Sequence, residues 1–259
     1  MNRQCERSEV EHVRRFVAYV KVRVNSTWYF PPRGGYQWLR YMVALALYSK
    51  CITVAEAIMV LLDAGFSDEA FGMTRTLVDI FITLRYIANK NTDDRAKLYY
   101  LYFTKDIQGW HEVIKDFWPR NAQTIPPRTL TVAATYAHPH RWSGKTVKEM
   151  ALEPDALDVD ATGKPLVYDF AYKVIYRWTS HYVHPTIGAL ENHVVQAGRD
   201  NFVVHSGYLK DMGNMAVFNV ASYVMHTMAW FYRCMGDPQP ERVGTWANAL
   251  MKHLIRRHK

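Results

Sequence analysis

The sequence predicts an all-α fold: a helical bundle of about seven helices with a small β-hairpin near residues 193–204. Apolar residues recur at helical spacing over several long stretches, two of which open on Ser67 or Thr92 followed by acids, and several are followed by Gly or Pro. Only the region 193–204 places two β-branched runs around a turn. With 259 residues, 49% of them hydrophobic, the chain is long enough to bury a sizeable core as a single helical domain over 1–259.

Basic residues outnumber acidic ones. Lys and Arg total 32 against 24 Asp and Glu, which gives a formal net charge of +8. This excess favours RNA or another polyanion as a partner, although net charge does not specify a fold. Part of it lies in a basic tail at 253–259, and such tails are more often solvated than bound to nucleic acid.

The cysteines and the chain start bear on the compartment. Cys5, Cys51 and Cys234 have neither a disulfide framework nor zinc-ligand spacing, which favours a reducing environment. The charged N-terminal stretch does not look like a signal peptide, so we expect a cytoplasmic protein. The apolar stretches 41–62 and 215–231 carry polar residues, which predicts buried core helices and no membrane association.

The first elements are amphipathic or apolar helices. Residues 9–25 carry apolar side chains at the spacing of one helical face, and the prolines and glycines of 31–35 break the pattern. From 36 to 63 the run is apolar on most sides, which predicts a central helix that Gly65 ends as a C-terminal cap. Ser67 and the two acids after it then predict the start of a helix that runs to about Asn89, with the serine oxygen capping its first amides.

That helix carries Arg75 and Asp79 one turn apart. One interpretation is an intrahelical ion pair on the surface, which would contribute a few tenths of a kcal/mol. The other follows from the apolar residues around the pair: a partly buried arginine needs a polar or anionic partner. The sequence leaves both open.

The middle of the chain is less regular. Thr92 and two acids open a helix to about Phe117, whose clustered aromatic residues are more often core than a base-stacking surface. We predict an irregular insertion around 118–164, with one short helix at 146–152. His138 and His140 are too few for a metal site, and the Ser-Gly-Lys-Thr run at 143–146 lacks the upstream glycine of a phosphate loop.

Three further helices are predicted. One runs from about Pro165 to His184 and is stopped by Pro185. After the hairpin, a helix at 208–235 ends before a glycine and a proline, and the last amphipathic helix occupies 241–256.

The helix that ends at Pro185 carries the residues of greatest functional interest. At about 100° per residue, one narrow sector holds Lys173, Arg177, Ser180, His181 and His184. The opposite side holds Ile175, Trp178, Thr179 and Tyr182. A neutral histidine can activate an RNA 2′-hydroxyl while a fixed arginine stabilises the charge that develops on the phosphorane, and this chemistry needs no metal.

Other interpretations of this sector stay open. It could be the solvated face of a surface helix, or a pocket for a small anion or a protein partner. A metal could be shared by His181 and His184 with Asp79 or Glu191, but no third ligand is predictable from the spacing.

Two motifs carry a resemblance to known families. Arg75-Thr76-Leu77-Val78-Asp79 and the ending Ser180-His181-Tyr182-Val183-His184-Pro185 resemble a bacterial family of all-helical proteins of unknown function, over roughly Leu39 to Met235. The Arg177-x6-His184 spacing is also similar to the signature of the HEPN superfamily of helical ribonucleases and toxins, although Trp178 stands where a polar residue is common. This second resemblance implies a homodimer that brings two motifs together over RNA, and metal-independent cleavage in a toxin or phage-defence setting.

The leading hypothesis is therefore a HEPN-like ribonuclease without metal or cofactor. His184 is its general base or acid, Arg177 stabilises the phosphate, and His181 and Ser180 are supporting donors. The residues expected at the substrate are Arg75, Asp79, Lys173 and Tyr176. The competing hypothesis is a non-catalytic helical module that senses or binds a partner.

Overall fold

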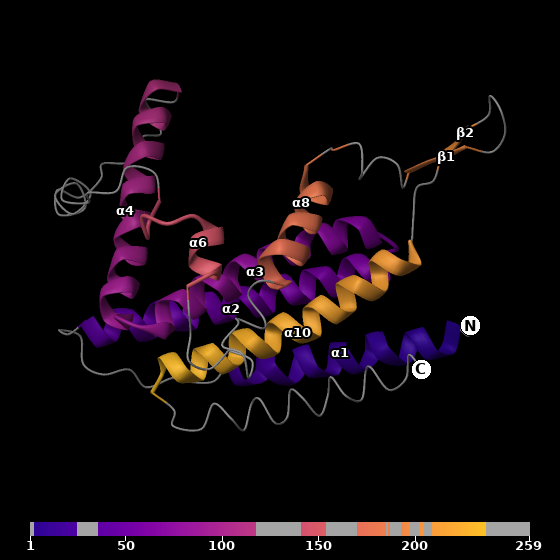
Figure 1. The fold of residues 1–259 in the computed structure, drawn as a ribbon, viewed down its shortest axis with the longest axis horizontal. Helices are drawn as coiled ribbons and strands as arrows, with labels where there is room; N and C mark the ends of the chain where they lie inside the picture. The colour runs from indigo at the N-terminus through magenta and orange to yellow at the C-terminus, as the bar shows by residue number, and fades with distance from the viewer. Residues whose placement is uncertain are drawn as a thin grey trace.

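The computed structural model describes residues 3–24, 36–117, 141–153, 170–184, 186, 193–196, 202–204 and 209–236. Its long helices are α1 (Arg3–Val24), α2 (Tyr36–Asp63), α3 (Ser67–Asn89), α4 (Thr92–Phe117) and α10 (Lys210–Cys234). Its shorter elements are α6 (Val147–Ala151), the π-helix η2 (Ala171–Tyr176), α8 (Arg177–Val183), β1 (Val194–Gln196) and β2 (Phe202–Val204). The predicted all-α fold is confirmed (Figure 1). The predicted last helix at 241–256 lies outside the described residues.

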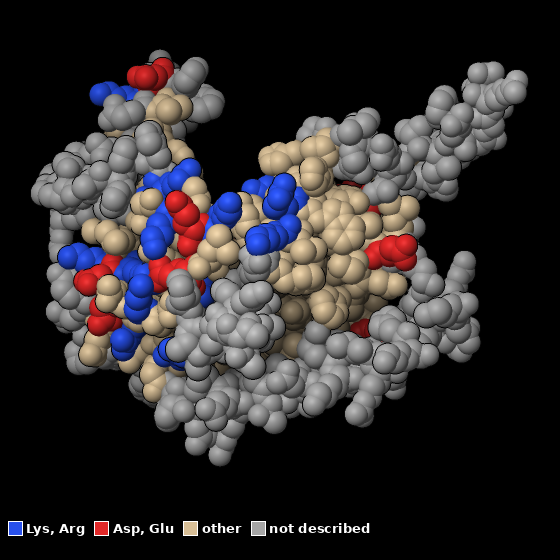
Figure 2. Space-filling view, viewed as in Figure 1, with Lys and Arg blue, Asp and Glu red and all other residues tan. Residues whose placement is uncertain are grey.

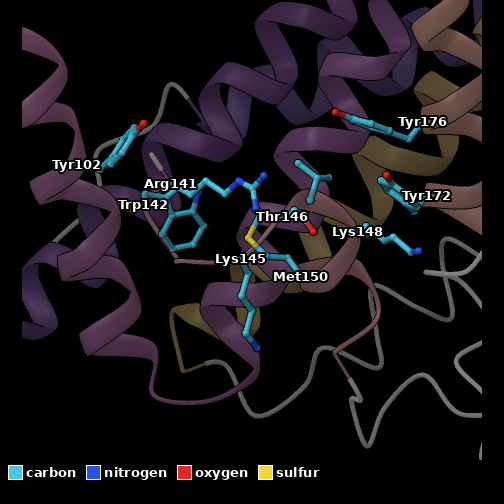
Figure 3. A pocket seen from close by; sticks show the side chains of 10 residues that line it. Tyr102, Arg141, Trp142, Lys145, Thr146, Lys148, Met150, Tyr172 and Tyr176 are labelled. Carbon is cyan, nitrogen blue, oxygen red and sulfur yellow. The ribbon is translucent and has the colours of Figure 1, made fainter. Parts of the chain in front are cut away.

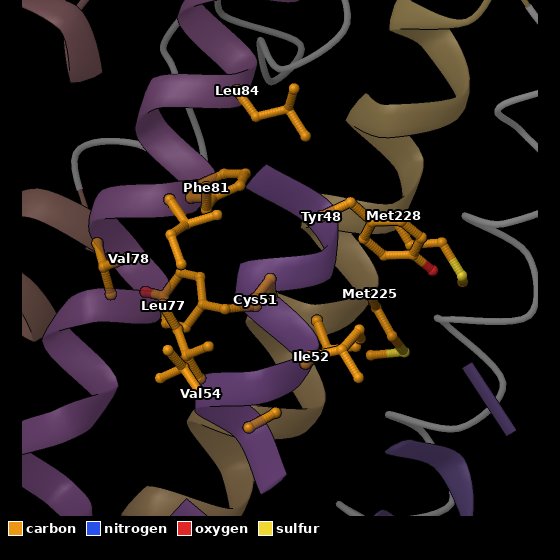
Figure 4. Close-up of a cluster of buried hydrophobic side chains, with 14 of the residues drawn as sticks. Tyr48, Cys51, Ile52, Val54, Leu77, Val78, Phe81, Leu84, Met225 and Met228 are labelled. Carbon is orange, nitrogen blue, oxygen red and sulfur yellow. The ribbon is translucent and has the colours of Figure 1, made fainter. Parts of the chain in front are cut away.

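Helix α3 lies at the centre of the bundle. It packs against α2 and α10 in the core and against α8 on its other side (Figure 1). Figure 4 shows the core between α2, α3 and α10, where Leu77 and Phe81 of α3 meet side chains of both neighbours. The rings of Tyr48 and Phe231 stack there at 4.5 Å between centroids. Side chains of α3 that point toward α8 therefore project from a helix that is held rigidly by the core.

Helix α2 is apolar on most of its surface because it is surrounded by other helices. Residues Gln37–Asp63 are long and apolar enough to cross a membrane, but half of the most apolar window is buried inside the bundle. This burial agrees with the predicted core helix and is consistent with a soluble protein. Gly65 ends the helix with φ +86°, a conformation that glycine adopts without strain.

The start of α3 differs from the prediction in its cap. Ser67 lies inside the helix, and its hydroxyl accepts a hydrogen bond from the backbone N–H of Leu209 at 2.6 Å. The predicted N-cap role is therefore wrong: this serine joins the start of α3 to the start of α10. Beside it, Asp68 lies 3.3 Å from His193, which precedes β1. The expected hairpin is present, with Val195 opposite Val203 in the antiparallel pair.

The predicted short helix at 146–152 is confirmed as α6, and its two ends are both capped. Thr146 and Glu149 form a capping box at the N-terminus. At the other end, the fully buried Arg85 of α3 donates to the carbonyl oxygens of Met150 at 3.1 Å and Glu153 at 2.5 Å. A buried arginine is stable here because the orphan carbonyls of a helix C-terminus accept its protons. Residues 118–140 and 154–164 of the predicted insertion lie outside the described residues.

A buried ion cluster holds the chain after α6 against α4. Arg95 lies 2.6 Å and Lys145 lies 2.7 Å from the Glu153 carboxylate, which is only 4% exposed. Burial raises the pKa of Glu153, but the hydrogen bonds from Lys145 and Arg95 outweigh it and lower the pKa overall. The cluster fixes the segment 141–153 beside η2. This segment forms one wall of a pocket.

Candidate functional site

The predicted helix to His184 is not one regular helix. It is described from Phe170 as the π-helix η2 followed directly by α8. A π turn bonds residue i to i+5 and rotates every residue after it relative to an α-helix. His184 also leaves the helix, with φ −109° and ψ 141°. The prediction that five side chains share one narrow sector of a regular helix is therefore wrong in its geometry. The sequence could not show this, because neither the π turn nor the extended His184 has a local sequence signature.

The burial pattern of the segment nonetheless follows the predicted two faces. Ala171, Ile175 and Thr179 are buried against the bundle. The exposed side chains include Lys173, Arg177, His181 and His184, whereas Ser180 is half-buried. Trp178 differs from the expected inward face because its side chain is 37% exposed.

Aromatic contacts and one glycine dock α8 on α3. Phe71 of α3 meets the rings of Trp178 and Tyr182 edge-on, at centroid distances of 5.2 Å and 5.1 Å. Gly72 allows the close approach, since a Cβ there would lie 3.3 Å from the Tyr182 Cβ. This packing brings Arg75, one turn beyond Phe71, to the side of α8.

Arg75 joins α3 to the η2–α8 segment at two points, the last residue of η2 and the residue after α8. Its Nη1 lies 3.3 Å from Nε2 of His184, and its Nη2 donates to the Tyr176 hydroxyl at 2.9 Å. The guanidinium carbon also lies 4.7 Å from the centroid of the Tyr176 ring. Because a guanidinium has only donors, a hydrogen bond between these two groups requires Nε2 of His184 as the acceptor, the tautomer with its proton on Nδ1. A neutral imidazole is the form that a general base requires.

Asp79 lies one turn beyond Arg75 and titrates near neutrality. Burial raises its pKa to about 6, and the nearby charge of Arg75 opposes that rise. No ion pair within 4.0 Å joins the two side chains in the described part of the chain, because Arg75 is bonded to Tyr176 and His184 instead. Burial and then the charge of Asp79 raise the pKa of Tyr99 on α4. Such perturbed acids are typical of functional sites.

The remaining predicted site residues make other contacts. The Ser180 hydroxyl donates to the Tyr176 carbonyl at 2.5 Å, so it is occupied within the helix. Nδ1 of His181 lies 3.4 Å from the Thr186 hydroxyl. Arg177 and Lys173 are exposed, and among the residues described here no hydrogen bond or ion pair joins Arg177 to His184. The guanidinium that meets the imidazole comes from α3 instead.

A pocket of about 390 Å³ is lined by Tyr176, the residue that binds Arg75 (Figure 3). Tyr176 belongs to both sites: its ring lines the pocket and its hydroxyl binds Arg75. The other aromatic residues that line it are Tyr102, Trp142 and Tyr172, and its cations are Arg141, Lys145 and Lys148. Figure 2 shows Lys and Arg side chains gathered on this face, over α6 and between α4 and α8.

The sequence reasoning missed this pocket. Its cations lie in the predicted insertion, where no periodicity indicates which side chains face inward. One sequence feature could have indicated it: the eight residues from Arg141 to Lys148 hold three cations and Trp142.

The described residues contain no group of three or more His, Cys, Asp or Glu side chains close enough to hold a metal ion. A site for a divalent metal built from His181, His184 and Asp79 is therefore not assembled in this part of the chain.

Comparison with known proteins bears on family and not on activity. A model described as a family of unknown function, DUF5677, matches residues 41–202, which is more than half of the chain. Neither the curated proteins nor the solved structures gave a match. The expected resemblance to a family of unknown function is thus supported, while the HEPN-like resemblance stays an expectation. The chain belongs to the DUF5677 family of unknown function.

Proposed function

We propose that this protein is a HEPN-like, metal-independent ribonuclease whose centre is the pair Arg75 and His184. The observation that carries the proposal is the 3.3 Å contact between these two side chains, which come from different helices. It sets a guanidinium beside an imidazole at an exposed position, and these two groups can stabilise the phosphorane and activate the 2′-hydroxyl.

In this mechanism His184 Nε2 removes the proton of the 2′-hydroxyl. The 2′-oxygen then bonds to the adjacent phosphorus, and the bond from phosphorus to the 5′-oxygen breaks. His181 acts as the general acid and donates a proton to the leaving 5′-oxygen, so the products are a 2′,3′-cyclic phosphate and a 5′-hydroxyl. Arg75 exchanges its bond to His184 for the non-bridging oxygens, where its charge stabilises the phosphorane.

Two neighbouring cations complete the proposed site. Arg177 and Lys173 are exposed on the same segment as His184 and would bind flanking phosphates. Arg177 thus keeps its proposed phosphate role, whereas Arg75 takes the position beside the base. Asp79 lies one turn behind Arg75 and interacts with its charge without a direct ion pair.

We further propose a cytoplasmic homodimer that acts in a toxin or phage-defence setting. Phe170, Val174 and Trp178 repeat every four residues along the η2–α8 segment and are 49%, 39% and 37% exposed. A second copy of the chain that covers this apolar row would bring two His184 side chains toward one RNA. The free, buried thiols of Cys51 and Cys234 are in keeping with a reducing compartment.

The competing proposal is a module that binds a polyanion without cleaving it. The exposed cations around the pocket favour this alternative, because they attract phosphate whether or not His184 acts as a base.

Cleavage of labelled RNA by the purified protein in EDTA separates the two. We expect cleavage with cyclic phosphate ends, a loss of about 10²–10⁴-fold in His184→Ala, and an unchanged rate in His12→Ala on the exposed surface of α1. RNA binding without cleavage, equal in wild type and His184→Ala, would support the module and reject the ribonuclease.

A further inference from the structure

The pocket beside Tyr176 has features that the cleavage chemistry does not use. Its volume of about 390 Å³ lies within the range of small-molecule sites, about 300–1,000 Å³, and far exceeds what one inorganic anion needs. It combines flat aromatic walls with cationic side chains. This combination fits a ligand that has both a flat ring and a phosphate.

The aromatic walls are held in fixed orientations. Tyr172 and Tyr176 stack on each other with centroids 5.1 Å apart and ring planes inclined by 19°. Trp142, on the other wall, is held edge-on by Tyr99 at 5.0 Å and Tyr86 at 5.6 Å. Rigid π surfaces bind an unpaired base through stacking, which contributes about 1–3 kcal/mol per base.

The cations of the pocket have different roles. Lys145 is paired with the buried carboxylate of Glu153 at 2.7 Å and therefore serves the fold. Arg141 and Lys148 are exposed at the pocket. Glu149, the acid of the capping box, is engaged by Thr146, and the charges of Arg141 and Lys145 further lower its pKa. Arg141 and Lys148 are thus placed to bind a phosphate.

Tyr176 connects the pocket to the proposed cleavage centre. Its ring lines the pocket while its hydroxyl accepts from Arg75 at 2.9 Å, and Arg75 in turn contacts His184. A base in the pocket would therefore place the phosphate of the neighbouring nucleotide beside the Arg75 guanidinium.

We propose that this pocket is a nucleotide subsite for single-stranded RNA, in which an unpaired base stacks on Tyr172 and Trp142 while Arg141 and Lys148 bind its phosphate. The subsite deepens the proposed function and rests on it for the identity of the ligand. It selects single strands because a paired base cannot enter a pocket between two aromatic walls.

Binding of a short single-stranded oligonucleotide with 2′-O-methyl groups tests the subsite without cleavage, since the attacking hydroxyl is blocked. Fluorescence anisotropy should give a Kd about tenfold higher for Tyr172→Leu and for the double variant Arg141→Ala/Lys148→Ala. Lys50→Ala removes one exposed cation of α2 and serves as the control for loss of surface charge; it should bind like wild type. A duplex of the same sequence should bind more weakly than the single strand.

The outcomes distinguish this proposal from the ribonuclease itself. Binding by wild type and His184→Ala that the pocket variants weaken supports the subsite even if no RNA is cleaved. Pocket variants that bind the single strand as tightly as Lys50→Ala overturn the subsite even if RNA is cleaved. Tighter binding of a phosphopeptide than of the oligonucleotide also overturns it. Circular dichroism shows whether Tyr172→Leu is folded. If it is not, the binding of the Arg141→Ala/Lys148→Ala variant still tests the subsite.

Discussion

Arg75 Nη1 and His184 Nε2 lie 3.3 Å apart although 109 residues separate them in the chain. The contact depends on the docking of α8 against α3, which Phe71 and Gly72 make close. Tyr176 fixes the other side of the guanidinium through its hydroxyl and its ring. A positively charged group is thereby held beside an exposed imidazole by contacts from two helices.

Replacing Arg75 tests the role of its charge and of its shape. We expect Arg75→Ala to lower RNA cleavage by about 10²–10³-fold, the usual effect of removing one fixed donor to a developing oxyanion. Arg75→Lys should recover only part of this loss, because an ammonium cannot bond Tyr176 and the phosphate in one plane. Steady-state kinetics should place the loss in kcat. The exposed Arg15→Ala on α1 is the control; equal rates in Arg75→Ala and Arg15→Ala would remove Arg75 from the site.

Gly72→Ala tests the docking of α8. The new Cβ would lie 3.3 Å from the Tyr182 Cβ, so α8 must move by a few tenths of an ångström. We expect cleavage to fall about tenfold, because small displacements of reacting groups are costly, while stability falls by only about 1 kcal/mol. Gly109→Ala on α4 is the matched control: nothing lies within 4 Å of its Cβ, and alanine in a helix interior should stabilise by about 0.5–1 kcal/mol. If Gly72→Ala cleaved RNA as fast as Gly109→Ala, the close packing of α8 on α3 would not be needed for activity.

Asp79→Asn should change the pH dependence of stability. The pKa of Asp79 is raised to about 6, so the folded state binds this proton more tightly than the unfolded chain does. The stability that the group contributes is fully present below about pH 4 and is lost as pH rises through 6. We expect Asp79→Asn to be more stable than wild type by about 1–3 kcal/mol at pH 8 and equal to it near pH 4. Urea unfolding at both pH values checks this, and a destabilised variant at pH 8 would contradict it.

Glu153→Gln should destabilise the protein by about 3–5 kcal/mol, because Arg95, with a side chain only 8% exposed, would keep a buried charge without its carboxylate. Since the pKa of Glu153 is lowered, its contribution is present above the unfolded-state pKa and is lost as pH falls through the folded one. Glu56→Gln breaks the exposed pair with Lys21 and should cost less than about 1 kcal/mol. Denaturant unfolding of both variants at pH 7 measures the difference, and equal costs would show that the Glu153 cluster is not a buried anchor.

The sequence predicted the helices well because their signals are local. The apolar run of 36–63 and Gly65 after it each act within a few residues, and both are present as expected. The predicted short helix at 146–152 is also present, and its capping box of Thr146 and Glu149 is equally local. Ser67 is the exception: its hydroxyl does not cap α3 but accepts a hydrogen bond from the backbone of Leu209, which is distant in the chain.

The site was less predictable because it depends on which faces meet. Arg75 and His184 could each be selected from their own helices, but their 3.3 Å contact requires the docking of α8 on α3. The π turn and the extended backbone of His184 have no recognised local pattern, so the predicted Arg177–His184 pairing on one sector could not be checked from spacing alone. The pocket depends on the buried anchor of Glu153, a contact that only the folded chain makes.

A double-mutant cycle on Arg75 and His184 tests the central claim most directly. Single-turnover cleavage of RNA in EDTA is measured for wild type, Arg75→Ala, His184→Ala and the double variant. If the two side chains act as one centre, the double variant should be no slower than His184→Ala alone, because the first loss already removes what the second residue assists. Independent losses that multiply in the double variant, or wild-type rates in both single variants, would contradict the account.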